Sequence, residues 1–174
     1  MTQEFRILVD QHRHRVYTFA YYSLGNREEA EDVTQEVLVR LWKNREELNT
    51  ATLGAWIRRV TRNACIDAVR RRRAYRTRVV ATGDGEDSLS GVSAEPAPDR
   101  AVETSELRAT IRSALSSLHE PYRSIVILRE IQDMKYEQIS ESLELPLNTV
   151  KSYLHRGRRM LRDKLGGTLD HESF

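Results

Sequence analysis

Hydrophobic residues recur every three or four positions over most of the chain, which is the spacing of one buried helix face. In the first half, this pattern predicts three helices: one beginning near Phe5, one after Asn26 and one after Thr52. Gly25 suits the end of the first helix, Asn26 with Glu29 suits a cap of the second, and Thr52 is the expected cap of the third. The apolar stripe of the third helix consists of Leu53, Trp56, Ile57, Val60, Ala64 and Ala68.

The helical periodicity stops between the two halves of the chain. Residues 83–99 contain five acids, no base, two prolines and three glycines. Such a composition cannot bury enough apolar surface to become ordered. We therefore expect a flexible acidic linker at 79–104, between an N-terminal helical domain at 1–78 and a C-terminal one at 105–167, with a tail at 168–174.

The second half contains a helix-turn-helix pattern. A short helix from Tyr136 is followed by a tight turn and then by a longer basic helix that ends near Leu165. Val150, Leu154 and Gly157 form the expected buried face of the longer helix. Its other face carries donors suited to base edges or phosphates in the major groove: Thr149, Lys151, Ser152, His155, Arg156 and Arg159. Ordinary solvated side chains are the alternative, but a basic face in this pattern favours DNA binding.

Charge is distributed unevenly along the chain, although the net charge is only +2. Nine arginines and one acid lie between Thr52 and Arg78, and six basic residues and one acid lie between Lys151 and Lys164. Seven acids and four bases fall within residues 26–48. Two basic segments indicate two contacts with a polyanion, and the acidic helix indicates a different partner. The fold class expected from these patterns is all-α.

Several classes of protein are excluded by what the sequence lacks. Cys65 is the sole cysteine, which leaves no disulfide framework and no cysteine-based zinc site within the chain. The sequence contains no P-loop, GxSxG, HExxH or GxGxxG motif, and His12 and His14 are not spaced as a metal-ligand pair. No apolar run approaches the roughly 18 residues that span a bilayer, and charge appears too early for a secretory signal. We expect a cytoplasmic protein without catalytic activity, metal, cofactor or membrane insertion.

Three stretches, taken together and in this order, resemble the extracytoplasmic-function (ECF) group of bacterial RNA polymerase sigma factors. They are residues 26–43 (NREEAEDVTQEVLVRLWK), residues 53–73 (LGAWIRRVTRNACIDAVRRRR) and residues 117–165, which include LHEPYRSIVILRE and YEQISESLELPLNTVKSYLHRGRRML. The resemblance covers nearly the whole chain except the linker and the tail. It implies a factor that binds core RNA polymerase and directs promoter-specific transcription initiation.

The resemblance also implies a role for each segment. The second helix would bind the clamp helices of the polymerase β′ subunit through Asp32, Gln35, Glu36 and Arg40. The third helix, with the loop at 44–52, would capture the melted non-template strand of the minus-ten element through Arg59, Arg62, Asn63, Arg70, Arg71 and Arg72. The C-terminal domain would read the minus-thirty-five element as duplex through the donors of its last helix and would dock on the polymerase β flap. An anti-sigma factor is a further expected partner.

The sequence departs from the family pattern within the helix-turn-helix. Glu144 stands where the family usually has glycine, and glycine accepts a left-handed backbone at lower cost than glutamate does. Asn148 replaces a residue that is usually small. These differences concern the shape of the turn and leave the implied function unchanged.

Two other functions compete with this interpretation. A free-standing regulator would explain the helix-turn-helix, but it leaves the acidic second helix and the arginine-rich third helix without a purpose. An RNA-binding or structural adaptor would prefer RNA and would have no effect on promoters.

Overall fold

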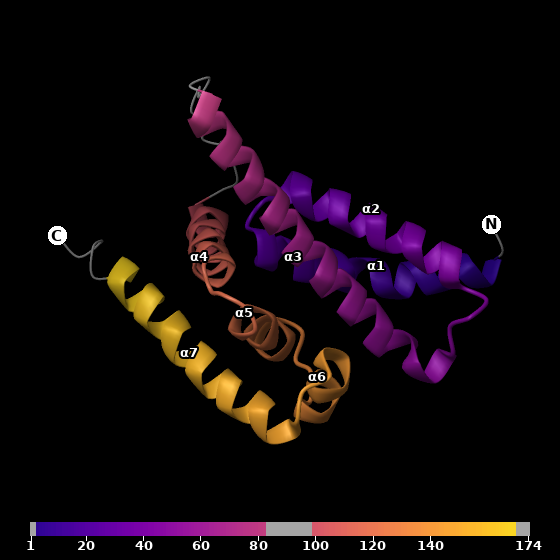
Figure 1. The fold of residues 1–174 in the computed structure, drawn as a ribbon. Helices are drawn as coiled ribbons and strands as arrows, with labels where there is room; N and C mark the ends of the chain where they lie inside the picture. The colour runs from indigo at the N-terminus through magenta and orange to yellow at the C-terminus, as the bar shows by residue number, and fades with distance from the viewer. Residues whose placement is uncertain (1–2, 83–98, 170–174) are drawn as a thin grey trace.

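The structure, a computed structural model, describes residues 3–82 and 99–169, and every regular element in these ranges is helical (Figure 1). The N-terminal half contains α1 (Gln3–Leu24), α2 (Arg27–Asn44) and α3 (Thr50–Thr82). The C-terminal half contains α4 (Asp99–Ser116), α5 (Tyr122–Val126), the π-helix η1 (Ile127–Ile131), α6 (Tyr136–Leu143) and α7 (Leu147–Leu169). The all-α prediction of two helical domains, the second a helix-turn-helix, is confirmed.

In the N-terminal half, α1, α2 and α3 pack against one another around the predicted apolar stripes. The turn between α1 and α2 follows the expected design. Gly25 has a φ of +71°, and the Asn26 side chain accepts a hydrogen bond from the Glu29 backbone N–H at 3.0 Å. That cap satisfies one of the donors that the first turn of a helix leaves free.

The third helix begins earlier than predicted, so the expected cap at Thr52 is wrong. The helix starts at Thr50, and Oδ1 of Asn49 accepts a hydrogen bond from the Ala51 backbone N–H at 2.9 Å. Asn49 is as good a capping residue as threonine and comes first along the chain.

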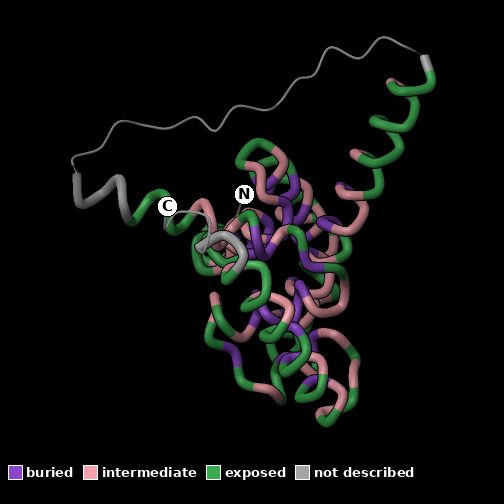
Figure 2. The backbone as a smooth tube through the Cα atoms, turned by 90° about the vertical axis from the view of Figure 1, so that its left-hand side faces the viewer, coloured by how far each residue is buried: buried purple, intermediate pink, exposed green. Residues whose placement is uncertain are grey.

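Both edges of the expected linker, residues 79–104, are helical. The third helix continues to Thr82, and α4 begins at Asp99. Residues 73–78 are exposed, so local preference for the helix extends α3 beyond its buried stripe. Figure 2 shows these last turns projecting from the rest of the protein. The remainder of the linker, 83–98, lies outside the described residues, as do 170–174 of the tail.

The C-terminal half is built around the segment formed by α5 and η1. Ile125, Val126, Ile127 and Leu128 are each at most 1% exposed, and α7 lies across this segment. The crossing is close, because a Cβ atom added to Gly157 would approach Val126 Cγ2 to 2.6 Å. Helix α6 is followed by its C-cap residue Glu144, whose φ of 55° and ψ of 42° are left-handed.

The two halves are in contact with each other. Helix α3 packs on α6, and α1 packs on α4 and η1. Gln132 Nε2 donates a hydrogen bond to the Arg15 backbone carbonyl at 2.8 Å, and the Arg112 guanidinium donates to the Tyr21 hydroxyl. Helix α7 packs on α4, α5 and α6 and lies at the far edge of the molecule from α1 and α2 (Figure 1). The placement of the halves therefore leaves α7 accessible.

We expect Gly157→Ala to destabilise the protein by about 1–3 kcal/mol, because the added methyl group has no room against Val126. Gly166→Ala is the matched control on the same helix, since nothing lies within 4 Å of the added Cβ, and alanine favours helix over glycine by up to about 1 kcal/mol. Urea unfolding followed by circular dichroism measures both. Equal effects of the two substitutions would contradict the close crossing of α5 and α7.

Candidate nucleic-acid interface

Helix α7 separates its apolar and polar residues onto opposite faces. Val150 and Leu154 are at most 1% exposed, and Gly157 is buried against Val126. Thr149 is half-buried, and the other predicted donors are exposed: Lys151, Ser152, His155, Arg156 and Arg159. The Ser152 hydroxyl donates a hydrogen bond to the Asn148 backbone carbonyl at 3.0 Å. This face meets the geometric requirement for a helix that enters the major groove.

The four residues predicted to bind polymerase lie together on the outer face of α2. Asp32 and Gln35 are exposed, whereas Glu36 and Arg40 form an ion pair at 2.6 Å. An open groove of about 370 Å³ runs between this face and α3, with Asp32 and Glu36 on one side and Arg71 on the other. Helix α2 thus offers carboxylates both to solvent and to α3.

The six predicted minus-ten residues do not form one continuous strip on α3. Arg72 is half-buried against the turn between α1 and α2, where its Nη1 donates to Glu29 Oε2 at 2.9 Å and to the Leu24 carbonyl at 3.3 Å. Arg71 is more exposed and lies 4.0 Å from Glu36 Oε2. Asn63 and Arg70 are exposed. Arg72 already satisfies carboxylate and carbonyl acceptors, so it is the least available of the six to a nucleic acid.

Glu120 joins the two halves through Arg62. Its Oε1 accepts from Arg123 Nε at 3.1 Å, and its Oε2 accepts from the Ser124 hydroxyl at 2.7 Å. The same Oε2 lies 3.6 Å from Arg62 Nε, which is buried and has no hydrogen-bond partner. A buried donor without an acceptor costs free energy, so the contact with Arg62 is the weak part of this cluster.

Two further contacts link α3 to the helix-turn-helix. Arg58 Nε donates to the Ser142 hydroxyl at 2.6 Å, and the Arg59 guanidinium forms a hydrogen-bonded ion pair with the Glu144 carboxylate. These partners are 84 and 85 positions apart in the sequence, so no local pattern could have revealed them. The unusual residue at the turn, Glu144, was the only available signal.

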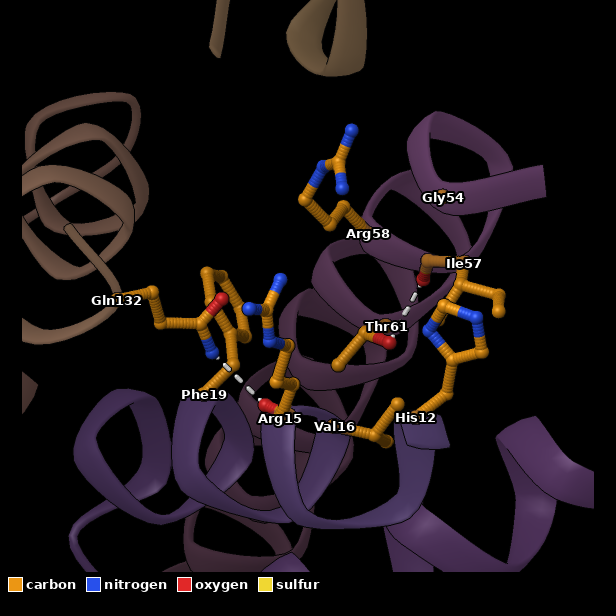
Figure 3. A pocket seen from close by; sticks show the side chains of 9 residues that line it. All are labelled: His12, Arg15, Val16, Phe19, Gly54, Ile57, Arg58, Thr61 and Gln132. Atoms are coloured by element: carbon orange, nitrogen blue, oxygen red, sulfur yellow. Dashed lines mark hydrogen bonds between the residues drawn. The ribbon is translucent and has the colours of Figure 1, made fainter. Parts of the chain in front are cut away.

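A cavity of about 30 Å³ lies beside these contacts, between α1, α3 and Gln132 (Figure 3). His12 and Arg15 of α1 and Arg58 of α3 line it. The pKa of His12 is lowered from its usual 6.5, first by burial and then by the positive charges of Arg15 and Arg58. The folded protein therefore favours the neutral imidazole.

Cys65 is packed in the core of the N-terminal half. It is 1% exposed, and burial raises the pKa of its thiol to about 12. A thiol in this state does not act as a nucleophile or a metal ligand at neutral pH. Across residues 3–82 and 99–169, no group of three or more His, Cys, Asp or Glu side chains is placed to hold a metal ion. No helix in the same ranges is long and apolar enough to cross a membrane.

We expect stability to fall in mild acid because of His12. Above a pH of about 6.5, the imidazole is neutral in both the folded and unfolded states and has no effect. As the pH falls through that value, the unfolded chain takes up the proton first. The free energy of unfolding then decreases until the pH passes below the lowered pKa of the folded state. His12→Gln should remove this part of the pH dependence of the free energy of unfolding. Urea unfolding of both proteins above and below pH 6.5 measures it. The prediction is wrong if the free energy of unfolding changes with pH equally in the two proteins.

Comparisons with known proteins match both halves of the chain. The model of the family described as Sigma-70 region 2 matches residues 8–75, and that of Sigma-70, region 4 matches residues 108–161. The chain is 39% identical to the ECF RNA polymerase sigma factor SigE of Mycolicibacterium smegmatis over 91% of this chain and 60% of that relative. It is 33% identical to the ECF RNA polymerase sigma factor SigW of Bacillus subtilis over 92% of this chain and 88% of that relative. The chain thus spans about 60% of the length of SigE and most of SigW.

Two solved structures share the fold. The sigma factor RpoE from Bartonella quintana, solved with the anti-sigma factor NepR, gives a TM-score of 0.72 at 23% identity over 95% of this chain and 98% of that one. CnrH, solved with the cytosolic domain of CnrY, gives a TM-score of 0.65 at 20% identity over 99% of this chain and 92% of that one.

Proposed function

The chain belongs to the ECF group of bacterial RNA polymerase sigma factors, and we propose from this that it binds core RNA polymerase and directs promoter-specific initiation. The observation that carries the proposal is the two-faced helix α7, with Val150 and Leu154 buried and a row of donors exposed. In this role the protein is a DNA-binding initiation factor and not a catalyst, and it requires no metal or cofactor.

The minus-thirty-five element is read as duplex by α7. The major groove of duplex DNA admits one helix, and the exposed face of α7 offers guanidinium, ammonium, imidazole and hydroxyl donors to it. Arg156 and Arg159 are suited to guanine or to phosphate, and Lys151 and Thr149 lie nearer the N-terminus of the helix, where an anion is favoured.

Core polymerase is bound by the outer face of α2. Asp32 and Gln35 are exposed there, and the Glu36–Arg40 ion pair lies beside them on the same face. The contact would be with the clamp helices of the β′ subunit. The first helices of the C-terminal half would dock on the β flap.

The minus-ten element is held by α3 as a melted single strand. Asn63 is exposed and can hydrogen-bond an unpaired base, and Arg70 can contact phosphate after releasing Asp67, which lies 3.5 Å away. Three further arginines would exchange their present carboxylate partners for phosphate: Arg59, Arg62 and Arg71. The exchange is possible because the paired N–H donors of a guanidinium fit both carboxylate and phosphate. Binding energy from both promoter elements would offset the few kcal/mol needed to unstack each base.

An anti-sigma factor is the expected regulatory partner, and the expected location is the cytoplasm. RpoE and CnrH, whose fold this chain shares, were each solved with a bound partner, in RpoE an anti-sigma factor by name.

The test of this function is transcription from a promoter library by core polymerase, with and without the protein. We expect transcripts that start a fixed distance below a shared two-part motif. Asp32→Lys should abolish both these transcripts and co-elution with core polymerase, because it reverses an exposed charge on the α2 face. Its unchanged circular dichroism is the control for folding. No new transcripts and no co-elution of the unsubstituted protein would overturn the proposal.

For the upstream element, we expect Arg156→Ala to weaken binding of the holoenzyme to its promoter by about 1–3 kcal/mol, the size of one lost bidentate base contact. The effect should disappear on promoters whose minus-thirty-five element is scrambled. If the loss is the same on scrambled DNA, Arg156 contacts phosphate and does not read sequence.

A further inference from the structure

One face of α3 is covered by the helix-turn-helix of the same chain. Arg59 is paired with Glu144, and the neighbouring Arg58 donates to Ser142 at 2.6 Å. One turn along, Arg62 Nε lies 3.6 Å from the carboxylate of Glu120. Arg59 and Arg62 are two of the residues proposed to hold the minus-ten strand. Their donors are therefore directed at carboxylates of the C-terminal half.

The backbone at Glu144 suggests that its side chain has a function. Residues with a Cβ are uncommon in the left-handed region, and those that occur there are mainly asparagine, aspartate and histidine. Glu144 adopts φ 55° and ψ 42° and bears the cost of that conformation. Its carboxylate forms an ion pair with Arg59 on the other domain. The side chain thus contributes to the interface between the halves and not to the turn itself.

We propose that Glu144 is an intramolecular latch: by pairing with Arg59, it holds the helix-turn-helix over the arginine face of α3 and keeps that face from single-stranded DNA until the two halves separate. The proposal rests on the proposed role of Arg59 and Arg62 in holding the minus-ten strand. Glu120 acts beside the latch on Arg62.

The chemistry of the interface makes the latch reversible. Glu144 is 68% and Arg59 39% exposed at their side chains, so water and salt can compete with the pair. The Arg62 contact is incomplete, because its buried Nε lacks a hydrogen-bond acceptor. A strand of DNA, with one phosphate for every nucleotide, offers both arginines a better set of acceptors.

The latch acts on one DNA surface only. Helix α6, which carries Ser142 and ends at Glu144, faces α3, whereas α7 packs within its own half and keeps its donors exposed. Closure therefore occupies Arg59 and Arg62 of the single-strand surface, while Asn63 and Arg70 stay exposed and the duplex-reading helix stays open.

The separation of the halves can be measured in the full chain without DNA or polymerase. Fluorophores on cysteines introduced at the exposed positions Glu47 and Arg162 report the distance between the halves by energy transfer, and the buried Cys65 stays unlabelled. We expect Glu144→Gln to raise the ratio of open to closed molecules about two- to fivefold, the size of one surface ion pair. Added salt should have the same effect on the unsubstituted protein.

The matched control is Glu130→Gln. It makes the same change in net charge and breaks a comparable ion pair, that of Glu130 with Arg158 at 2.6 Å, which lies within the C-terminal half. This variant should leave the distance unchanged. With unlabelled proteins, affinity for short single-stranded DNA of random sequence should rise about two- to fivefold in Glu144→Gln and not in Glu130→Gln.

Two more variants separate the carboxylate from the backbone. Glu144→Gly removes both the charge and the left-handed cost, so it should open the protein about as much as Glu144→Gln. Exchanging the charges, with Arg59→Glu and Glu144→Arg together, should restore closure. The latch is overturned if Glu144→Gln leaves the distance unchanged, or if only the glycine variant opens the protein.

Failure of the latch and failure of the proposed transcriptional role give different results. If Glu144→Gln opens the protein and raises its affinity for single strands while no promoter is used, the latch stands and the sigma function falls. If promoters are used and the distance does not respond to Glu144, the function stands and the latch falls.

Discussion

The positive charge of the α3 arginines must be balanced by anions, and carboxylates from both halves of the structure lie against this helix. Nine arginines and one acid lie between Thr52 and Arg78, and like charges at helical spacing repel. On one side, Glu29 and Glu36 of α2 form ion pairs with these arginines. On the other side, Glu120 and Glu144 of the C-terminal half do the same. The apolar stripe fixes where α3 lies, and these carboxylates help determine how the two halves meet.

Local patterns were sufficient where a helix face or a cap lies within a few residues. The burial of Val150 and Leu154 and the cap at Asn26 followed from spacing alone. The start of α3 did not, because residues 49–52 offer several capping residues and local preference cannot choose among them. The helical edges of the linker were also missed, since composition identifies a polar segment but not the residue at which a helix ends.

In the candidate site, too, local features could be predicted from the sequence and contacts between distant residues could not. The exposed donors of α7 could be predicted because one helix carries both the buried and the exposed face. The surroundings of the arginines could not, because the partner of Arg72 is 43 positions away and that of Arg59 is 85 positions away. The run at 70–73 reads as one basic block, yet the helical turn directs Arg72 toward the turn between α1 and α2 and Arg70 toward solvent. Sequence identified the charged segment, and only the packing divided it into different environments.

The glutamate at the end of α6 also has a genetic consequence. Glutamate and glycine codons differ only in the middle base, so a single A-to-G transition converts Glu144 to glycine. That one substitution would relax the left-handed residue and release Arg59 at the same time. A lineage selected for a factor that is always open would need only this step.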